Sequence, residues 1–161
     1  MKKILACLIS LAVACGTVVA QEAAKPAHTF VKASEIKWGD PPPVFEKGMR
    51  FAVISGDPGQ PGLYVIRAKL PAGYKINPHF HPADEHVTVL SGTFALGMGE
   101  KFDKATMTKF SAGGYALLPA DMRHYAMATT EAIIQVHGMG PFGLTYVNPA
   151  DDPSTRAAAT K

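Results

Sequence analysis

The stretch Gly73-Tyr-Lys-Ile-Asn-Pro-His79-Phe-His81-Pro-Ala-Asp-Glu85-His-Val-Thr-Val-Leu-Ser-Gly92 carries the strongest structural signal in this 161-residue sequence. His79 and His81 lie two residues apart. On an extended strand, residues i and i+2 point to the same face, with their side chains roughly 6 to 7 Å apart. The two imidazoles can therefore converge on one metal ion.

A carboxylate is expected beside this histidine pair. Glu85 follows the short turn Pro82-Ala83-Asp84, and we expect it to begin a strand that runs back beside the strand of the two histidines. Alternation along that strand predicts that Glu85, Val87 and Val89 share the inner face, whereas His86 points outward as a surface or interface residue.

A fourth ligand is expected from a distant strand, and His124 is the candidate because it follows the turn Pro119-Ala120-Asp121. Three neutral imidazoles and one carboxylate suit one divalent transition-metal ion: iron, manganese, nickel, copper or zinc. Calcium and magnesium prefer oxygen ligands. The sequence thus predicts a metal site formed by His79, His81, Glu85 and His124.

Outside this motif, glycine and proline recur at short intervals and leave segments that suit strands better than helices. Segments rich in branched and aromatic residues predict strands at Phe51 to Ser55, Leu63 to Leu70, His86 to Leu90, Thr93 to Met98, Tyr115 to Leu118 and Ile133 to His137. We expect no helix and no internal repeat. The fold class indicated is all-β, an antiparallel sandwich or barrel, since closing such a sheet removes exposed edges.

The opening stretch resembles the first cupin motif, and every spacing fits: a glycine, five residues, His-x-His, three residues, a glutamate, six residues and a glycine. The stretch Gly113-Gly-Tyr-Ala-Leu-Leu-Pro119-Ala-Asp121-Met-Arg-His124 resembles the second motif. It departs from that motif at Asp121, where glycine is usual, and at Ala128, where asparagine is usual. Aspartate tolerates tight turns, so the first departure is mild.

The resemblance extends from about Met49 to Val147. Within the family, the sequence around the two motifs is similar to that of small exported bacterial cupins. It implies a cupin double-stranded β-helix, an antiparallel jelly-roll barrel with the metal inside. It also implies a homodimer, because cupin barrels often pair through their outer strands.

The first twenty residues are expected to be a secretory signal peptide. Lys2 and Lys3 precede an apolar run from Ile4 to Val13, which is shorter than the roughly 18 to 20 residues that span a bilayer. No later segment is long enough to span a membrane. We therefore expect export, most simply to the periplasm of a Gram-negative bacterium. A lipid anchor on Cys15 is the alternative, because the preceding residues loosely resemble a lipobox.

Beyond the signal, we expect a flexible N-terminal segment at 21–30, the barrel domain at 31–150 and a flexible tail at 151–161. Removal of the signal would leave no cysteine, which excludes disulfides and thiol catalysis. It would also leave 14 basic and 13 acidic residues, since two of the 16 basic residues lie in the signal. Such a near-neutral domain lacks the basic footprint of a nucleic-acid-binding protein.

Gln135 and His137 are candidates for a second layer around the metal. They alternate with Ile134 and Val136 on one strand, so they would contact a substrate only if their face of the strand lines the barrel. The sequence leaves both orientations open. The methionines, among them Met98, Met122 and Met139, show no spacing typical of copper(I) ligation and are expected to fill gaps in the core.

Four protein ligands on a six-coordinate metal leave two neighbouring positions for a substrate, dioxygen or water. We therefore expect a metal-dependent enzyme that acts on a small oxygenated molecule, such as a dioxygenase of diketone or enediol substrates. Fold resemblance alone does not establish activity. A non-catalytic, metal-dependent binding or sensing module and a metal scavenger are the alternatives.

Overall fold

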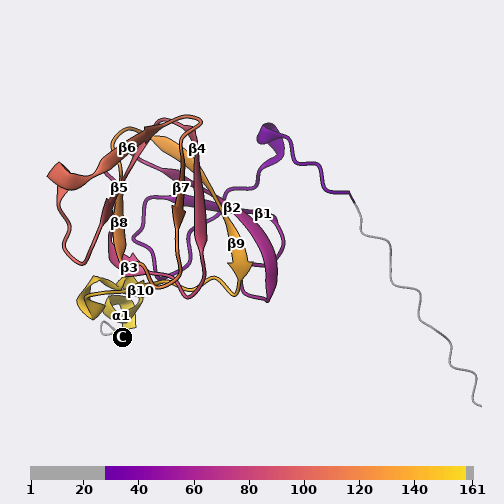
Figure 1. Cartoon of the computed structure of the whole chain (residues 1–161). Helices are drawn as coiled ribbons and strands as arrows, with labels where there is room; N and C mark the ends of the chain where they lie inside the picture. Colours follow the sequence, from indigo (N-terminus) through magenta and orange to yellow (C-terminus); the bar gives the residue numbers. More distant parts are fainter. Residues whose placement is uncertain (1–27, 159–161) are drawn as a thin grey trace, which may run out of the picture.

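Ten strands form two five-stranded sheets that face each other (Figure 1). The computed structural model describes residues 28–158, so the expected signal peptide and Cys15 lie outside the described residues. The first sheet has the strand order β1 (Arg50–Ser55), β2 (Gly62–Leu70), β9 (Ala132–Gly140), β4 (Glu85–Ser91) and β7 (Tyr115–Leu118). The second has the order β10 (Thr145–Tyr146), β3 (Lys75–Phe80), β8 (His124–Ala128), β5 (Thr93–Met98) and β6 (Thr108–Ser111).

Each pair of neighbouring strands is antiparallel, and the expected jelly-roll barrel is confirmed. All six strands expected from the sequence are present, two of them with unchanged ends. The second sheet consists of β5 and four strands whose bounds were not predicted: β3 and β8, expected only as the strands of His79 and His124, and β6 and β10, which were not expected. Their sequences are short and interrupted by polar residues, which weakens the alternation on which strand prediction depends.

Alternate side chains of the strands fill the space between the sheets. In β2, Tyr64, Ile66, Ala68 and Leu70 are buried, while the intervening residues face outward. Leu70 is fully buried, and residues from β4, β5, β8 and β9 complete the same core. This regular alternation, with one face in the core, fixes the strand register, because a shift by one residue would turn the apolar side chains into solvent.

Three short 3₁₀ turns, η1 (Ala33–Glu35), η2 (Lys104–Thr106) and η3 (Pro149–Asp151), and one helix, α1 (Pro153–Ala158), complete the described chain. The expectation of no helix is therefore wrong for α1. The Asp152 side chain accepts hydrogen bonds from the backbone amide and the hydroxyl of Ser154, and Pro153 begins the helix. Aspartate as a cap followed by proline is a helix-start signal that the sequence does contain.

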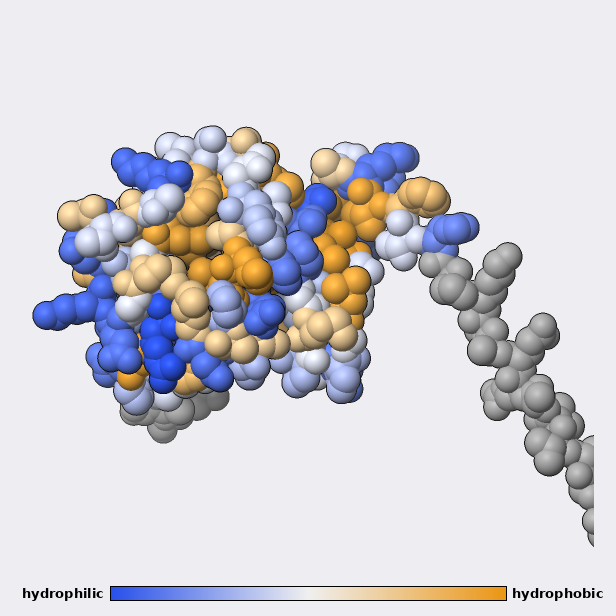
Figure 2. Space-filling model, in the orientation of Figure 1, coloured by the Kyte–Doolittle hydropathy of each residue, from blue (hydrophilic) through white to orange (hydrophobic). Residues whose placement is uncertain are grey.

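None of the helices within residues 28–158 has the length and apolar character of a transmembrane span. Several large hydrophobic side chains nevertheless remain in contact with solvent, and Figure 2 shows apolar patches among the polar ones on the face in view. Three of the methionines expected in the core belong to this group: Met98 is 51% exposed, Met122 is 40% exposed and Met139 is 59% exposed. That expectation is wrong for these three because Met98 is the last residue of β5, Met122 lies in a turn and Met139 lies on the outward face of β9.

Candidate metal centre

Four side chains expected at the metal site come together inside the barrel. His79 lies near the end of β3, His81 follows that strand, Glu85 begins β4 and His124 begins β8. All four are buried. The coordinating nitrogens of the three histidines lie within 4.8 Å of one another, and His79 faces His124 directly across the pairing of β3 with β8.

Glu85 reaches the histidines by a different route from the expected one. The sequence predicted that the strand of Glu85 would pair with the strand of His79, but β4 pairs with β7 and β9, whereas β3 pairs with β8 and β10. The turn from Pro82 to Asp84 crosses from one sheet to the other. The carboxylate therefore faces the imidazoles across the interior, and both sheets contribute to the site.

The orientation of each imidazole is fixed by a backbone carbonyl. Nδ1 lies 2.7 Å from the Asn77 oxygen in His79, 2.6 Å from the Gly143 oxygen in His81 and 2.9 Å from the Met122 oxygen in His124. A carbonyl only accepts hydrogen bonds, so Nδ1 must carry the proton in all three rings. In each neutral ring, Nε2 is then the unprotonated nitrogen, and it is the one available to a metal ion.

The Glu85 carboxylate lies next to two of these nitrogens. Its Oε2 atom is 3.4 Å from Nε2 of His81 and 3.4 Å from Nε2 of His124. This separation is long for a hydrogen bond, and Nε2 of His81 is shielded from solvent with no hydrogen-bond partner among the described residues. A buried nitrogen without a partner is costly, so the geometry calls for an additional group between these atoms.

The surroundings of the cluster keep His79 neutral and Glu85 negatively charged. Burial and the neighbouring imidazoles His124 and His81 lower the pKa of His79 to about 3, so His79 is neutral at physiological pH. Burial alone would raise the pKa of Glu85, but the contacts with His124 and His81 outweigh it and hold that pKa well below its ordinary value. Glu85 is thus an anion at the centre of the site.

His81 behaves differently from His79. Burial would lower its pKa, but the adjacent Glu85 carboxylate and the Gly143 carbonyl raise it above the ordinary value for histidine. The Glu85 carboxylate thus favours a second proton on His81, at Nε2. A metal ion that binds here therefore has to replace that proton.

The turn before His124 accommodates the first departure from the second motif. Asp121 stands where glycine is usual, and its φ angle is 61°, in the left-handed region that glycine adopts freely. Its amide donates to the His81 carbonyl over 2.8 Å. The turn therefore keeps its shape and links the segment of His81 to the segment of His124.

Aromatic side chains enclose the histidines. The Phe142 ring stacks on His81, with ring centroids 5.0 Å apart, and Tyr146 lies 6.1 Å from His79. Tyr64 is buried with its edge toward Phe142, and burial together with the Glu85 charge raises the pKa of its hydroxyl. The sequence gave no basis for placing Tyr64 or Tyr146 here, because each comes from a strand whose inward face was not assigned.

A small cavity of about 30 Å³ adjoins the cluster inside the barrel. His79, Glu85 and His124 line one part of it, and the rest of its wall is apolar: Ile76, Val87, Phe94, Leu96, Ala126 and Ile134. A cavity of this size holds one or two water molecules but no organic substrate of ordinary size. The interior next to the ligands therefore suits a small, water-sized group.

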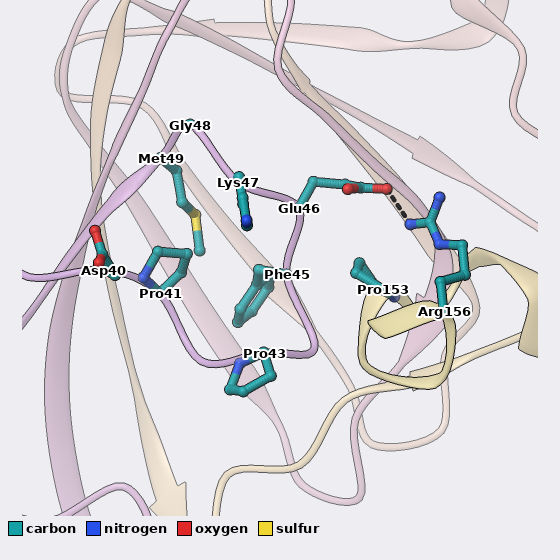
Figure 3. A pocket seen from close by; sticks show the side chains of 10 residues that line it. All are labelled: Asp40, Pro41, Pro43, Phe45, Glu46, Lys47, Gly48, Met49, Pro153 and Arg156. Atoms are coloured by element: carbon teal, nitrogen blue, oxygen red, sulfur yellow. Dashed lines mark hydrogen bonds and ion pairs between the residues drawn. The ribbon is translucent and has the colours of Figure 1, made fainter. Parts of the chain in front are cut away.

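A larger hollow of about 760 Å³ lies elsewhere, between residues 40–49 and α1 (Figure 3). Three prolines, Phe45 and Met49 make up half of the residues in its wall, and the ion pair of Glu46 with Arg156 lies at one side (Figure 3). None of the four candidate ligands lines it. Size alone does not make it the reactive site, so the barrel interior remains the place where chemistry-bearing groups converge.

Gln135 and His137, considered as a second layer around the metal, are not in the interior. Their neighbours Ile134 and Val136 occupy the inward positions of β9, so Gln135 and His137 lie on the outer face of the first sheet. Gln135 accepts a hydrogen bond from Arg67 over 3.0 Å, and His137 stacks on His86. His86 points outward as expected.

Comparison with known proteins agrees with this architecture. The sequence matches the family model of the ChrR cupin-like domain over residues 26–143. Comparison with curated proteins gives no match.

Three solved structures illustrate the likeness of the fold. The polyketide cyclase RemF from Streptomyces resistomycificus is 16% identical with a TM-score of 0.65, over 82% of this chain and 94% of that one. A proposed acetylacetone dioxygenase from Methylibium petroleiphilum is 19% identical with a TM-score of 0.62, over 88% and 100%. A mutant of salicylate 1,2-dioxygenase from Pseudoaminobacter salicylatoxidans, in complex with gentisate, is 16% identical with a TM-score of 0.51, over 63% and 30%. At these identities the likeness concerns the fold alone.

Proposed function

Because the chain belongs to the ChrR cupin-like family, within the cupin superfamily, we propose that it is an exported, metal-dependent enzyme that acts on a small oxygenated molecule. The observation that carries this proposal is the set of three imidazoles whose Nε2 atoms converge beside one buried carboxylate. A purely structural network would pair these atoms with one another, and it would not leave Nε2 of His81 without a partner.

The spacing of the donor atoms fits a transition-metal ion. Two atoms that each lie about 2.1 Å from one ion are roughly 3.0 to 3.4 Å apart when they subtend 90 to 110°. Glu85 Oε2 lies 3.4 Å from each of two imidazole nitrogens. Imidazole and carboxylate donors together suit iron, manganese, nickel, copper or zinc. We propose one such ion per chain, held by His79, His81, Glu85 and His124.

When bound, such an ion supplies Lewis acidity, and redox chemistry if it is iron, manganese or copper. The residues of the chain have separate tasks. The carbonyls that accept from Nδ1 hold the imidazoles in one orientation, and Glu85 supplies the single negative charge. The apolar wall formed by Val87, Phe94 and Ile134 excludes bulk water from the reacting group.

We propose a diketone, an enediol or a hydroxylated aromatic acid as substrate. Two fold neighbours support this class: the proposed acetylacetone dioxygenase, and the salicylate dioxygenase mutant that holds gentisate. Such molecules carry two neighbouring oxygens that can approach a metal together. The 30 Å³ cavity admits only a water-sized group, so binding of an organic substrate requires side chains around the ligands to move.

The test is oxygen consumption and product formation by the metal-loaded chain with a panel of diketones, catechols, salicylates and oxalate. We expect turnover of at least one compound and its loss in His81→Ala, with Gln135→Ala as the control on the outer face. Substrate consumption without oxygen uptake would instead indicate a lyase or cyclase. The absence of any turnover across the panel by metal-loaded protein would contradict the proposed activity.

A non-catalytic binding or sensing module is the second candidate, because few groups able to transfer a proton face the interior. No inward-facing acid or base other than the ligands, Tyr64 and Tyr146 lies at the site among the described residues. The two functions differ in one measurement, because a module binds a small molecule tightly in calorimetry without converting it. A scavenger would exchange metal rapidly and bind no small molecule.

Export and pairing complete the proposal. The expected signal at residues 1–20 predicts that the cell envelope holds a chain beginning at Gln21, which mass spectrometry of the periplasmic fraction would detect. A mass increased by lipid on Cys15 would support the anchored alternative. A homodimer stays a prediction, which light scattering at several concentrations would test.

A further inference from the structure

One buried tyrosine differs from the others because its hydroxyl group has no partner. The tyrosines with buried side chains are Tyr64, Tyr74, Tyr125 and Tyr146. The hydroxyls of the last three each donate to a main-chain carbonyl, over 2.6, 3.1 and 3.0 Å respectively. The Tyr64 hydroxyl makes no hydrogen bond within residues 28–158, although only 2% of the residue is exposed.

A hydroxyl in this position has to find its partner outside the protein chain. Nearly all buried polar side-chain atoms are hydrogen-bonded to protein or to ordered water, because an unpaired one costs free energy. A phenylalanine ring would fill the same space in the core without that cost. The hydroxyl of Tyr64 therefore points to a water molecule or a bound ligand as its partner.

The Tyr64 hydroxyl lies close to the turn that leads into Glu85. Tyr64 on β2 pairs directly with Gly138 on β9. A Cβ atom placed on Gly138 would lie 3.1 Å from the Tyr64 hydroxyl oxygen and 2.7 Å from the carbonyl oxygen of Asp84. Glycine at this position thus leaves the space that the tyrosine side chain needs. The hydroxyl ends beside the residue that precedes the candidate ligand Glu85.

The ring of Phe142 lies between Tyr64 and the histidines. The Tyr64 and Phe142 rings meet edge to face, with centroids 5.7 Å apart and an angle of 66°, and Phe142 stacks on His81 with centroids 5.0 Å apart. Tyr64 and His81 are therefore neighbours of the same ring. Burial and the charge of Glu85 raise the pKa of Tyr64, so its hydroxyl keeps the proton at physiological pH and can act as a donor.

We propose that the Tyr64 hydroxyl donates a hydrogen bond to an oxygen atom of the small molecule that binds beside His81 and Glu85. This inference rests on the proposed function, because it assigns a binding residue to that substrate. Hydrogen bonds to charged acceptors are the stronger ones, so Tyr64 favours a substrate whose oxygen carries negative charge, such as the enolate of a diketone. It selects against analogues that lack this oxygen.

The first test compares two substitutions that each remove one hydroxyl from a buried ring. Tyr74→Phe, the matched control, loses the hydrogen bond to the Glu46 carbonyl, so its metal-free form should melt about 4 °C below the unsubstituted protein. Tyr64→Phe loses no bond within the chain, so its melting temperature should change by less than about 1 °C. An equal fall in both variants would show that Tyr64 has a partner within the protein and would overturn the proposal.

The second test measures ligand affinity by calorimetry with two probes, acetylacetone and salicylate. Zinc-loaded protein is used because zinc has no redox chemistry, so binding is recorded without oxidative turnover. Tyr64→Phe should bind the probe about five- to tenfold more weakly than the unsubstituted protein, whereas Tyr74→Phe should bind it equally well. The affinity for zinc should change less than about threefold in both variants, since neither hydroxyl belongs to the ligand set.

The outcomes separate this inference from the proposed function. Equal affinity of Tyr64→Phe and the unsubstituted protein for a probe that both bind would overturn the role of Tyr64 and leave the proposed function intact. If the unsubstituted zinc-loaded protein binds neither probe, the proposed substrate class is contradicted, and the role of Tyr64 as a donor to that substrate with it.

Discussion

Replacement of Glu85 by glutamine should abolish most of the stabilisation that a metal ion gives to the fold. Glutamine keeps the shape of the side chain but removes the only negative charge among the four ligands. Mutation of residues that only hydrogen-bond to the ligands of a metal site already weakens metal affinity 10- to 100-fold. Loss of an anion that binds the metal directly should weaken it by at least the upper end of that range. We therefore expect at least hundredfold weaker binding in Glu85→Gln.

The loss of metal affinity can be measured as a smaller metal-induced rise in melting temperature. A metal ion at a hundred times its dissociation constant raises the free energy of unfolding by about 2.7 kcal/mol, and a hundredfold loss of affinity reduces this to about 0.4 kcal/mol. For the 131 residues from 28 to 158, the entropy of unfolding is roughly 0.28 kcal/mol/K. The metal should then raise the melting temperature by about 10 °C in the unsubstituted protein and by about 1.5 °C in Glu85→Gln.

The assay is differential scanning fluorimetry with and without the metal, so that each variant is compared with its own metal-free form. Glu131→Gln is the matched control, because the Glu131 carboxylate is exposed and forms only a surface ion pair with Lys69 at 3.4 Å. It should keep the full 10 °C shift, since surface ion pairs contribute about 0 to 1 kcal/mol. A full metal-induced shift in Glu85→Gln would refute the assignment of Glu85 as a ligand.

Three further predictions follow from the same geometry. Because the pKa of His81 is raised above its ordinary value, metal binding at pH 6.5 should release more than half a proton per chain, measured by calorimetry in buffers of different ionisation enthalpy, and less in Glu85→Gln. Above pH 6.5 the metal-free protein should lose stability as the pH rises through the pKa of His81, because a raised histidine pKa stabilises the fold only while the ring is protonated; a rising melting temperature in that window would contradict it. Phe142→Ala should lower the free energy of unfolding by about 2 kcal/mol and accelerate metal exchange with a chelator, whereas Phe30→Ala, at an 88% exposed position, should change neither. Asp121→Gly should leave the free energy of unfolding unchanged or raise it by up to about 1 kcal/mol in denaturant unfolding, whereas Asp121→Val should lower it by roughly 1 to 2 kcal/mol because of the positive φ; equal stability of the two variants would contradict the backbone argument.

Local spacing in the sequence was sufficient to predict which four side chains the structure brings together inside the barrel. His79 and His81 lie on one side of an extended segment, and Glu85 occupies the inward position that alternation with Val87 and Val89 predicts. The second motif identified His124 correctly as a neighbour of the pair, and the turn at Asp121 forms without glycine. Each of these features depends on a few consecutive residues, which is why a sequence alone can reveal them.

Features that depend on contacts between distant segments were out of reach. The same-face rule cannot tell which sheet a strand joins, so the placement of β3 and β4 in opposite sheets was missed. The sequence could not tell whether Gln135 and His137 point inward, because either face of an alternating strand can line the core. The burial of Ile134 shows that they point outward. The bond between His81 and the Gly143 carbonyl joins residues 62 positions apart, and no local pattern encodes it.

The three carbonyl acceptors at Asn77, Met122 and Gly143 also bear on how the protein can be altered. A side-chain partner can be lost in one mutation, whereas a main-chain oxygen is present whatever residue occupies the position. Most substitutions at Asn77, Met122 and Gly143 should therefore leave the orientation of the imidazole rings unchanged, as long as the backbone of the strands and turns is retained. For an engineer, the wall formed by Val87, Phe94 and Ile134 can then be varied to retune metal preference or ligand size, with the three rings still pointing at the same place.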